Sequence, residues 1–176
     1  MRDPPPFEST TVLGSYDGDL RRLIHLLKYE RMRPLATRLG RSLGERVAAA
    51  GVNADVVIPV PLHWRRRLSR EFNQAALVAL KLAAEIDSEC KPYWLRRLKA
   101  TAPQAGLTDR ERIRNVRGAF RVAAAEKIRG RRVLIVDDVM TTGSTLAACA
   151  RAVKRAGADS VVVAALARAH RERLVS

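Results

Sequence analysis

With 176 residues, of which 47% are hydrophobic, the chain is long enough for one compact domain with a sizeable core and too short for two comfortable ones. Its formal net charge of +15 suits an anionic ligand or a nucleic acid and does not choose between them. Two cysteines without C-x-x-C spacing argue against disulfides or a cysteine zinc site, and without a signal core or membrane-length apolar run we expect a cytoplasmic protein.

The first part of the chain predicts a leader, a short strand and two helices, followed by a second strand. Residues 1–15 are a proline-rich leader that we expect to be partly disordered, although 10–15 also have the composition of a short strand. Leucines and isoleucines at helical spacing predict one helix over 20–28 and another over 35–50. The aliphatic run at 55–59 predicts a buried strand that leads into a loop of prolines and arginines.

The rest of the chain continues this alternation of strands and helices. A helix is predicted over 75–86, and strands are predicted over 93–98, 119–122, 133–136 and 160–167. The polar segment 99–115 has no tidy periodicity and suits either an active-site lid or a plain loop. Strands alternating with helices predict an α/β fold whose central, mostly parallel sheet is flanked by helices and joined by right-handed crossovers.

The stretch VLIVDDVMTTGSTL, residues 133–146, combines a buried strand with groups that suit ligand binding. Asp137 and Asp138 follow the strand at 133–136, and small hydroxyl residues follow them at the start of a helix. Ligands bind outside the carboxyl ends of parallel strands, and a helix N-terminus favours phosphate. The two carboxylates can accept hydrogen bonds from sugar hydroxyls or lie near a hard cation such as Mg²⁺. We therefore predict one site for a sugar, a phosphate and a metal.

Structural alternatives explain part of this stretch. Thr142 or Ser144 could be only the capping residue of the helix, but a cap needs one such side chain and the loop supplies several. The sequence motifs of nucleoside triphosphate-binding loops and of dinucleotide-binding loops are absent. A phosphoacceptor receiver domain also has an apolar strand that ends in Asp-Asp, but in that domain the pair lies near the start. Here the residues after Asp138 are too few to form the rest of a receiver domain.

A second group of candidate residues follows the strand at 55–59. Arg65, Arg66, Arg67 and Arg70 form a basic loop at the carboxyl end of that strand. Taken alone, such a run is usually a solvated surface. Because parallel strands share one carboxyl edge, we expect this loop to face the acidic pair, where it could hold a second phosphate group with Mg²⁺ between.

These motifs resemble the type I phosphoribosyltransferases, and more narrowly the ComF (GntX-like) family, which is named for a competence protein of DNA-taking bacteria. VLIVDDVMTTGST is similar to the fingerprint for 5-phosphoribosyl 1-diphosphate, abbreviated PRPP. The further matches are LKY at 27–29, PVPLH at 59–63, FNQA at 72–75, the spaced Lys99, Thr101 and Gln104, and ERIRNVRGAF at 111–120. The resemblance extends over nearly the whole chain from about Tyr16.

The resemblance implies one phosphoribosyltransferase domain over 16–176, with a small N-terminal hood over about 16–54. The ribose and 5-phosphate of PRPP would be held by Asp137, Asp138, Val139, Met140, Thr141, Thr142, Gly143, Ser144 and Thr145. The pyrophosphate loop would comprise Val60, Pro61, Leu62, His63, Arg67 and Arg70. Catalytic roles fall to Asp137, Asp138, Lys99 and Arg112, with 99–115 as a mobile cover and the two aspartates indirectly near Mg²⁺.

The implied reaction is Mg²⁺-dependent transfer of a phosphoribosyl group to an unidentified acceptor, a nucleobase or similar, with release of pyrophosphate, in connection with DNA uptake. The alternative is a non-catalytic protein that senses PRPP or a nucleotide and handles single-stranded DNA with DNA-processing partners. The low aromatic content of 5% speaks against a stacking platform for DNA bases. The acceptor, direct DNA binding and a homo-oligomer stay open.

The chain departs from the family's pattern in two places. Many relatives carry an N-terminal four-cysteine zinc ribbon, whose ligands are absent here. Glu71 stands where relatives usually have glycine, and it places a carboxylate beside the expected pyrophosphate loop.

Overall fold

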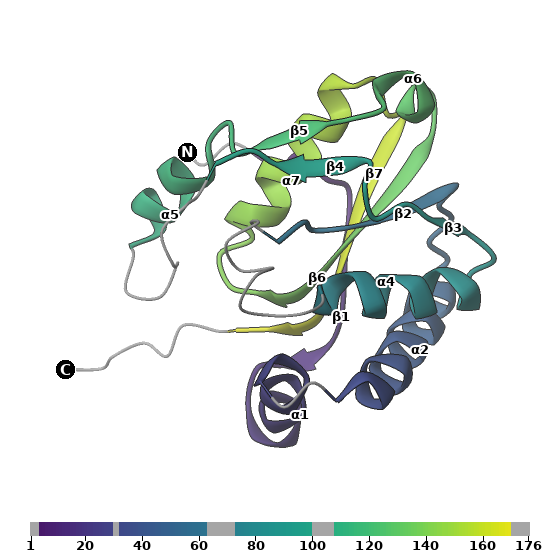
Figure 1. Ribbon diagram of the computed structural model, residues 1–176, viewed down its shortest axis with the longest axis vertical. Coiled ribbons are helices and arrows are strands. Elements are labelled where there is room, and N and C mark those ends of the chain that lie inside the picture. The colour runs from purple at the N-terminus through teal and green to yellow at the C-terminus, as the bar shows by residue number, and fades with distance from the viewer. Residues whose placement is uncertain (1–3, 30–31, 63–72, 100–107, 170–176) are drawn as a thin grey trace.

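The computed structural model describes residues 4–29, 32–62, 73–99 and 108–169 (Figure 1). Its elements are β1 (Thr10–Ser15), α1 (Gly18–Tyr29), α2 (Arg33–Ala49), β2 (Val56–Pro59), α4 (Gln74–Glu85), β3 (Glu89–Cys90), β4 (Leu95–Arg97), α5 (Asp109–Val116), β5 (Phe120–Val122), α6 (Ala125–Ile128), β6 (Arg132–Met140), α7 (Ser144–Arg155) and β7 (Ser160–Arg168). No helix in these ranges is long and apolar enough to cross a bilayer.

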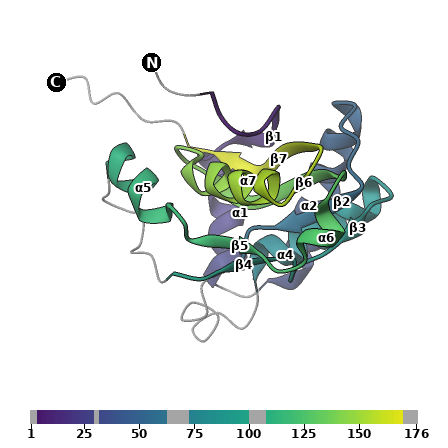
Figure 2. The same ribbon diagram turned by 90° about the horizontal axis from the view of Figure 1, so that it is seen from above.

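The main sheet has five strands in the order β1-β7-β6-β2-β3, and every neighbouring pair is parallel. Strands β4 and β5 form a separate antiparallel pair, and Figures 1 and 2 both show α5 beyond one end of that pair, away from the sheet. In the centre of the main sheet, Val136 of β6 lies opposite Pro59 of β2 and Ala164 of β7. This architecture confirms the predicted α/β fold with a mostly parallel sheet flanked by helices.

Strand β6 divides the hydrophobic core into two layers because its side chains alternate between the faces of the sheet. Val133 and Ile135 are buried in the layer with α5, α6, α7, β4 and β5. Leu134 and Val136 are buried in the layer with α1, α2 and α4. A strand buried on both faces favours the continuous aliphatic run that the sequence has here.

The structure corrects the predicted end of this strand. The sequence ended it at residue 136, whereas β6 continues to Met140, so that Asp137 and Asp138 belong to the strand. The reason is that β7 runs alongside, with Asp137 opposite Ala165 and Met140 opposite Arg168. The acidic pair is therefore held by the sheet and not by a loop.

Helix α5 (Asp109–Val116) begins inside the segment 99–115, for which no regular structure was predicted, and ends one residue beyond it. It begins with a capping box in which the Thr108 N–H donates to Oε2 of Glu111 at 2.7 Å and the Glu111 N–H donates to Oγ1 of Thr108 at 3.4 Å. The motif T-x-x-E at 108–111 indicates a helix N-terminus with a capping box, and the sequence-based prediction did not use it.

The N-terminal segments contribute one strand and two helices, and the strand agrees with the one predicted over 10–15. Strand β1, within the expected leader, pairs with β7 at the edge of the main sheet. Of the expected hood, α2 packs beside α4 on one face of the sheet, whereas α1 follows the carboxyl end of β1 (Figure 1). Only α1 is therefore placed near the edge where ligands bind in such folds.

Gly40 permits the close approach of α2 and α4. A Cβ atom at Gly40 would lie 2.7 Å from the backbone oxygen of Val78 and 2.8 Å from Cβ of Lys81. We expect Gly40→Ala to lower the free energy of unfolding by about 1–2 kcal/mol, since the clash outweighs the gain in helix propensity. Urea denaturation of both proteins measures this, and a more stable variant would contradict the described packing.

Candidate functional site

The candidate site lies at the carboxyl edge of the main sheet, where β2 ends beside Val136 and β6 continues to Met140. The Val60 N–H donates to the backbone oxygen of Val136 at 2.8 Å, so the chain after β2 begins beside the acidic pair. The Asn73 side chain donates to the Val60 oxygen at 3.1 Å and caps α4, which fixes the far end of this connection. The chain after β2, which was predicted to share an edge with the acidic pair, thus starts beside it, whereas the loop after β6 starts further on, beyond Met140.

Only part of the predicted pyrophosphate loop lies within the described residues. Val60, Pro61 and Leu62 follow β2 as expected, with Val60 buried and the other two half-buried. The remaining predicted residues of this region lie outside the described ranges: His63, Arg65, Arg66, Arg67, Arg70 and Glu71. Their proposed contacts with pyrophosphate stay predictions.

The two aspartates are oriented by short backbone hydrogen bonds and by a lysine from α1. The Asp138 N–H donates to Oδ1 of Asp137 at 2.9 Å, and the Val139 N–H donates to Oδ1 of Asp138 at 2.6 Å. Nζ of Lys28 lies 2.9 Å from Oδ2 of Asp138, and these two side chains are 17% and 21% exposed. Such limited exposure reduces screening by water, so this pair interacts more strongly than a surface ion pair.

Burial and the neighbouring Asp138 carboxylate raise the pKa of Asp137 to about 7. The hydrogen bond from the Asp138 backbone and the positive charges of Lys28 and Arg97 act in the opposite direction. Two adjacent carboxylates that are removed from water favour retention of one proton. A cation or a sugar hydroxyl that binds here would relieve the same repulsion.

This shift predicts a pH dependence of stability. The pKa of Asp137 is raised in the folded state, so its contribution to stability is fully present below about pH 4 and is lost as the pH rises towards 7. The Asp137→Asn variant cannot ionise, so we expect its advantage over the wild type to grow by roughly 1–3 kcal/mol across this range. Urea denaturation of both ligand-free proteins at several pH values measures the difference, and parallel curves would contradict the shift.

The loop after β6 makes a sharp turn into α7. Gly143 has φ = 72°, a left-handed conformation that favours glycine, and it is the N-cap residue of α7. The Thr142 hydroxyl donates to Oγ of Ser144 at 3.0 Å and accepts from the Ser144 N–H at 3.4 Å. Neither Thr142 nor Ser144 is the N-cap, so that alternative reading of the sequence is wrong.

A small pocket connects this loop with Asp137. Its lining residues are Asp137, Val139, Met140, Thr141, Gly143, Ser144, Thr145 and Leu146. Ser144 is only 5% exposed, so its hydroxyl is buried at the helix N-terminus. The structure thus brings together the Asp137 carboxylate and the hydroxyl loop. The positive end of the α7 dipole favours an anion at this place.

The donors at this edge are suited to a hard cation. Within the described ranges, no three His, Cys, Asp or Glu side chains come together as a metal site. Mg²⁺ needs fewer protein ligands, since it keeps several waters and takes oxygens from substrate phosphates. The adjacent carboxylates of Asp137 and Asp138 fit that requirement.

The other two predicted catalytic residues lie on the β4–β5 side of the molecule. Lys99 follows β4, its side chain is exposed, and its ammonium lies beside Gly118 at the turn before β5. Arg112 lies in α5, but its side chain is outside what the structure describes. Their catalytic roles stay predictions.

Lys28 and Arg97 are site residues that sequence reasoning missed. Lys28 occurs in the LKY motif, and the sequence-based prediction assigned it only as the end of a helix. A lysine that follows an apolar run gives no indication in the sequence of which carboxylate it will contact. Arg97 of β4 acts electrostatically on Asp137, and its guanidinium lies 5.4 Å from the ring centre of Phe120. Both come from elements far from β6 in the sequence, so only the tertiary fold brings them together.

The two cysteines, Cys90 and Cys149, are free thiols. Burial raises the pKa of Cys149, which lies in α7, well above its usual range, and burial raises that of Cys90 to about 11. A thiol that stays protonated is a poor nucleophile.

Comparison with known proteins gives one family and several relatives. The family described as phosphoribosyl transferase domain matches residues 73–176. The chain is 38% identical to the DNA utilization protein YhgH of Escherichia coli O157:H7, over 96% of this chain and 75% of that protein. It is 31% identical to Competence protein F of Haemophilus influenzae, over 96% of this chain and 76% of that protein.

Among solved structures, the fold is similar to that of glutamine phosphoribosylpyrophosphate amidotransferase from B. subtilis. The TM-score is 0.51 with 23% sequence identity, over 74% of this chain and 25% of that chain. At this identity the likeness concerns the fold alone.

Proposed function

Because the chain belongs to the phosphoribosyltransferase domain family and, within it, to the ComF family, we propose that it binds PRPP with Mg²⁺ and transfers the phosphoribosyl group to an acceptor. The observation that carries this proposal is the pair Asp137 and Asp138 on β6, directly before a glycine-capped turn at the N-terminus of α7. This order supports a sugar site beside a phosphate site.

In the proposed complex each part of PRPP meets a different part of the edge. The ribose hydroxyls donate to the carboxylates of Asp137 and Asp138, which can only accept when they are ionised. The 5-phosphate lies on the turn at 141–145, at the positive end of the α7 dipole. The pyrophosphate lies towards Val60, where the connection after β2 begins.

The proposed reaction is displacement of pyrophosphate from C1 of the ribose by a nucleophile of the acceptor, through an oxocarbenium-like state. The protein orients the reactants, and the carboxylates of Asp137 and Asp138 stabilise the positive charge that develops on the sugar. Mg²⁺, when bound, neutralises charge on the departing pyrophosphate. No side chain has to become a covalent nucleophile.

Binding of PRPP is expected to stabilise the protein against heat. A ligand selective for the native state adds about 2.7 kcal/mol to the free energy of unfolding at a hundred times its dissociation constant. The measurement is a thermal melt with PRPP and Mg²⁺, with ribose 5-phosphate alone as the weaker control ligand. An unchanged melting temperature at saturating PRPP would contradict the proposal.

A second candidate is a PRPP sensor that acts in DNA uptake without turnover. The names of two relatives, DNA utilization protein and Competence protein F, favour a DNA-related setting for either candidate. The net charge of +15 also suits contact with nucleic acid. Release of pyrophosphate from PRPP with candidate bases would favour the enzyme, whereas saturable binding without release would favour the sensor.

A further inference from the structure

Lys28 is the residue through which helix α1 reaches the acidic pair. It lies in the last turn of α1, and its Nζ atom is 2.9 Å from Oδ2 of Asp138. The lysine side chain is 17% exposed and that of Asp138 is 21% exposed, so water screens the two charges only weakly. A positive charge therefore lies beside the carboxylate that is proposed to hold a ribose hydroxyl.

The apolar side of α1 holds Lys28 in this place. Ile24 and Leu27 are fully buried in the core layer that also contains Leu166 of β7. Leu20 and Leu23 pack against the same layer. A helix that is anchored along its apolar side cannot easily rotate, so the lysine is positioned before any ligand arrives.

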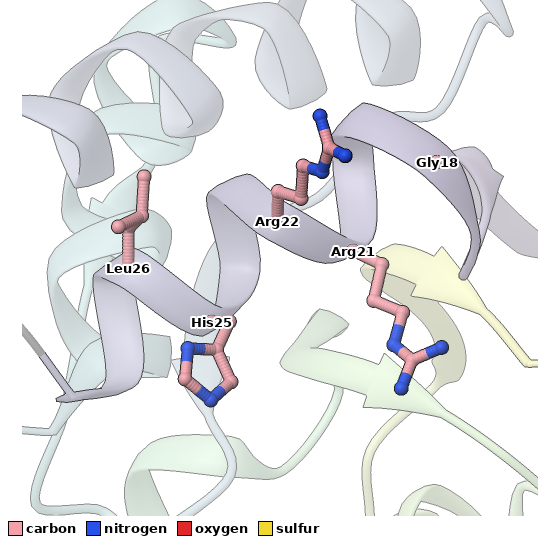
Figure 3. Close-up of a pocket in the computed structure, with 5 residues that line it drawn as sticks. All are labelled: Gly18, Arg21, Arg22, His25 and Leu26. Atoms are coloured by element: carbon pink, nitrogen blue, oxygen red, sulfur yellow. The ribbon is translucent and has the colours of Figure 1, made fainter.

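The arginines of α1 are arranged differently from Lys28. Figure 3 shows Arg21 and Arg22 projecting from opposite sides of the helix, so their guanidinium groups do not converge on one anion. Arg22 lies 3.7 Å from Asp19, and its side chain is 83% exposed, so water screens its charge. The charge of Lys28, in contrast, is largely enclosed and directed at the acidic pair.

The two carboxylates of the acidic pair have different surroundings, because successive residues of a strand point to opposite faces of the sheet. Asp137 lines the pocket beside the turn at 141–145, whereas Asp138 contacts Lys28 of α1. An ionised carboxylate has about four lone-pair positions, so Asp138 can accept from a sugar hydroxyl while it keeps its contact with the lysine. A ribose held by Asp138 therefore lies next to an ammonium group.

We propose that the ammonium group of Lys28 favours retention of PRPP over its turnover. This inference rests on the proposed function. PRPP carries several negative charges before the reaction, and the ammonium group attracts them. In the oxocarbenium-like state positive charge develops on the ribose. The ammonium group repels this charge, and it also neutralises the Asp138 carboxylate that would otherwise stabilise it. Lys28 thus strengthens binding and slows transfer.

The step that reveals this role needs no acceptor other than water. A bond forms between the water oxygen and C1 of the ribose, the bond from C1 to the pyrophosphate oxygen breaks, and its electron pair leaves with the pyrophosphate. A proton of the attacking water passes to the solvent, and the products are ribose 5-phosphate and pyrophosphate. Retention is therefore measured as slow release of pyrophosphate from bound PRPP.

The test replaces Lys28 by Met, which removes the charge and keeps most of the side chain. In the presence of Mg²⁺, we expect the dissociation constant of PRPP from calorimetric titration to rise about fivefold or more. At saturating PRPP, and after subtraction of the release without protein, we expect pyrophosphate release to become about tenfold faster or more. A merely structural role gives a different result, because a disordered site lowers both the affinity and the rate. Lys28→Arg keeps the charge and is expected to retain slow release.

Lys154→Met is the matched control. Lys154 also lies in the last turn of a helix, α7, and its Nζ atom is 3.4 Å from Oε1 of Glu8, at the opposite end of α7 from the turn at 141–145. This variant is expected to leave affinity and rate unchanged. Absence of PRPP binding in the wild type would contradict the proposed function itself. When the wild type binds PRPP, the inference alone is overturned by unchanged affinity in Lys28→Met, by release that is not faster, or by equal changes in Lys154→Met.

Discussion

Replacing Asp137 and Asp138 together by Asn is expected to weaken binding of PRPP with Mg²⁺ by about a hundredfold or more. Each carboxylate is proposed to accept a hydrogen bond from a ribose hydroxyl, and hydrogen bonds to charged groups contribute about 1.5–3 kcal/mol each. Asn has nearly the same shape but carries no charge and presents one acceptor oxygen in place of two. The dissociation constant from calorimetric titration measures the loss.

The matched control for this double variant is the pair Asp87 and Asp159, both exposed and outside the candidate site, changed to Asn. It removes the same formal charge, so it separates local contacts from a general effect of charge. The Asp137/Asp138 variant is expected to remain folded, because burial and repulsion by Asp138, which raise the pKa of Asp137, do not act against an uncharged Asn. Wild-type affinity in this variant would remove the assignment of the sugar site.

Changing Gly143 to Ala is expected to abolish most phosphate binding at the turn before α7. Gly143 has φ = 72°, which costs an alanine about 1–2 kcal/mol, and its Cβ would lie 2.8 Å from Cε of Met140. Met140 can move, but relief of the strain would also redirect the backbone N–H groups that face the proposed 5-phosphate. We expect PRPP affinity to fall by about a hundredfold, with a smaller loss of affinity for pyrophosphate alone.

Gly130 offers a control with the same backbone strain away from the site. It has φ = 70°, and an added Cβ there meets no described atom within 4 Å. Gly130→Ala should therefore lose about as much stability as Gly143→Ala but keep its PRPP affinity. Equal PRPP affinity in the two variants would show that the turn at Gly143 does not hold the phosphate.

The sequence was most informative where local patterns and tertiary packing agree. The aliphatic run at 133–136 predicted a buried central strand, and β6 is that strand. The run could not show that the strand continues through Asp137 and Asp138, because polar residues usually end a buried strand and only the pairing with β7 extends this one. The capping box at 108–111 shows the opposite case, a local signal that was present and overlooked.

The sequence predicted the loops that form the candidate site. It did not predict the contacts that more distant elements make with the acidic pair. The order of carboxylates, hydroxyl residues and helix predicted that Asp137 and Ser144 would lie close together, and the structure places both around one pocket. Lys28 and Arg97 could not be assigned in this way, since each reaches the acidic pair from a distant element. Long-range ion pairs leave no periodic pattern in a sequence, so they became visible only with the fold.

A crystal structure of the protein with PRPP and Mg²⁺ tests the central claim most directly. The account predicts that the 5-phosphate lies on the turn at 141–145, at the N-terminus of α7, and that the ribose hydroxyls lie within hydrogen-bonding distance of the Asp137 and Asp138 carboxylates. PRPP bound away from the carboxyl end of β6, or no PRPP bound at saturating concentration, would contradict it.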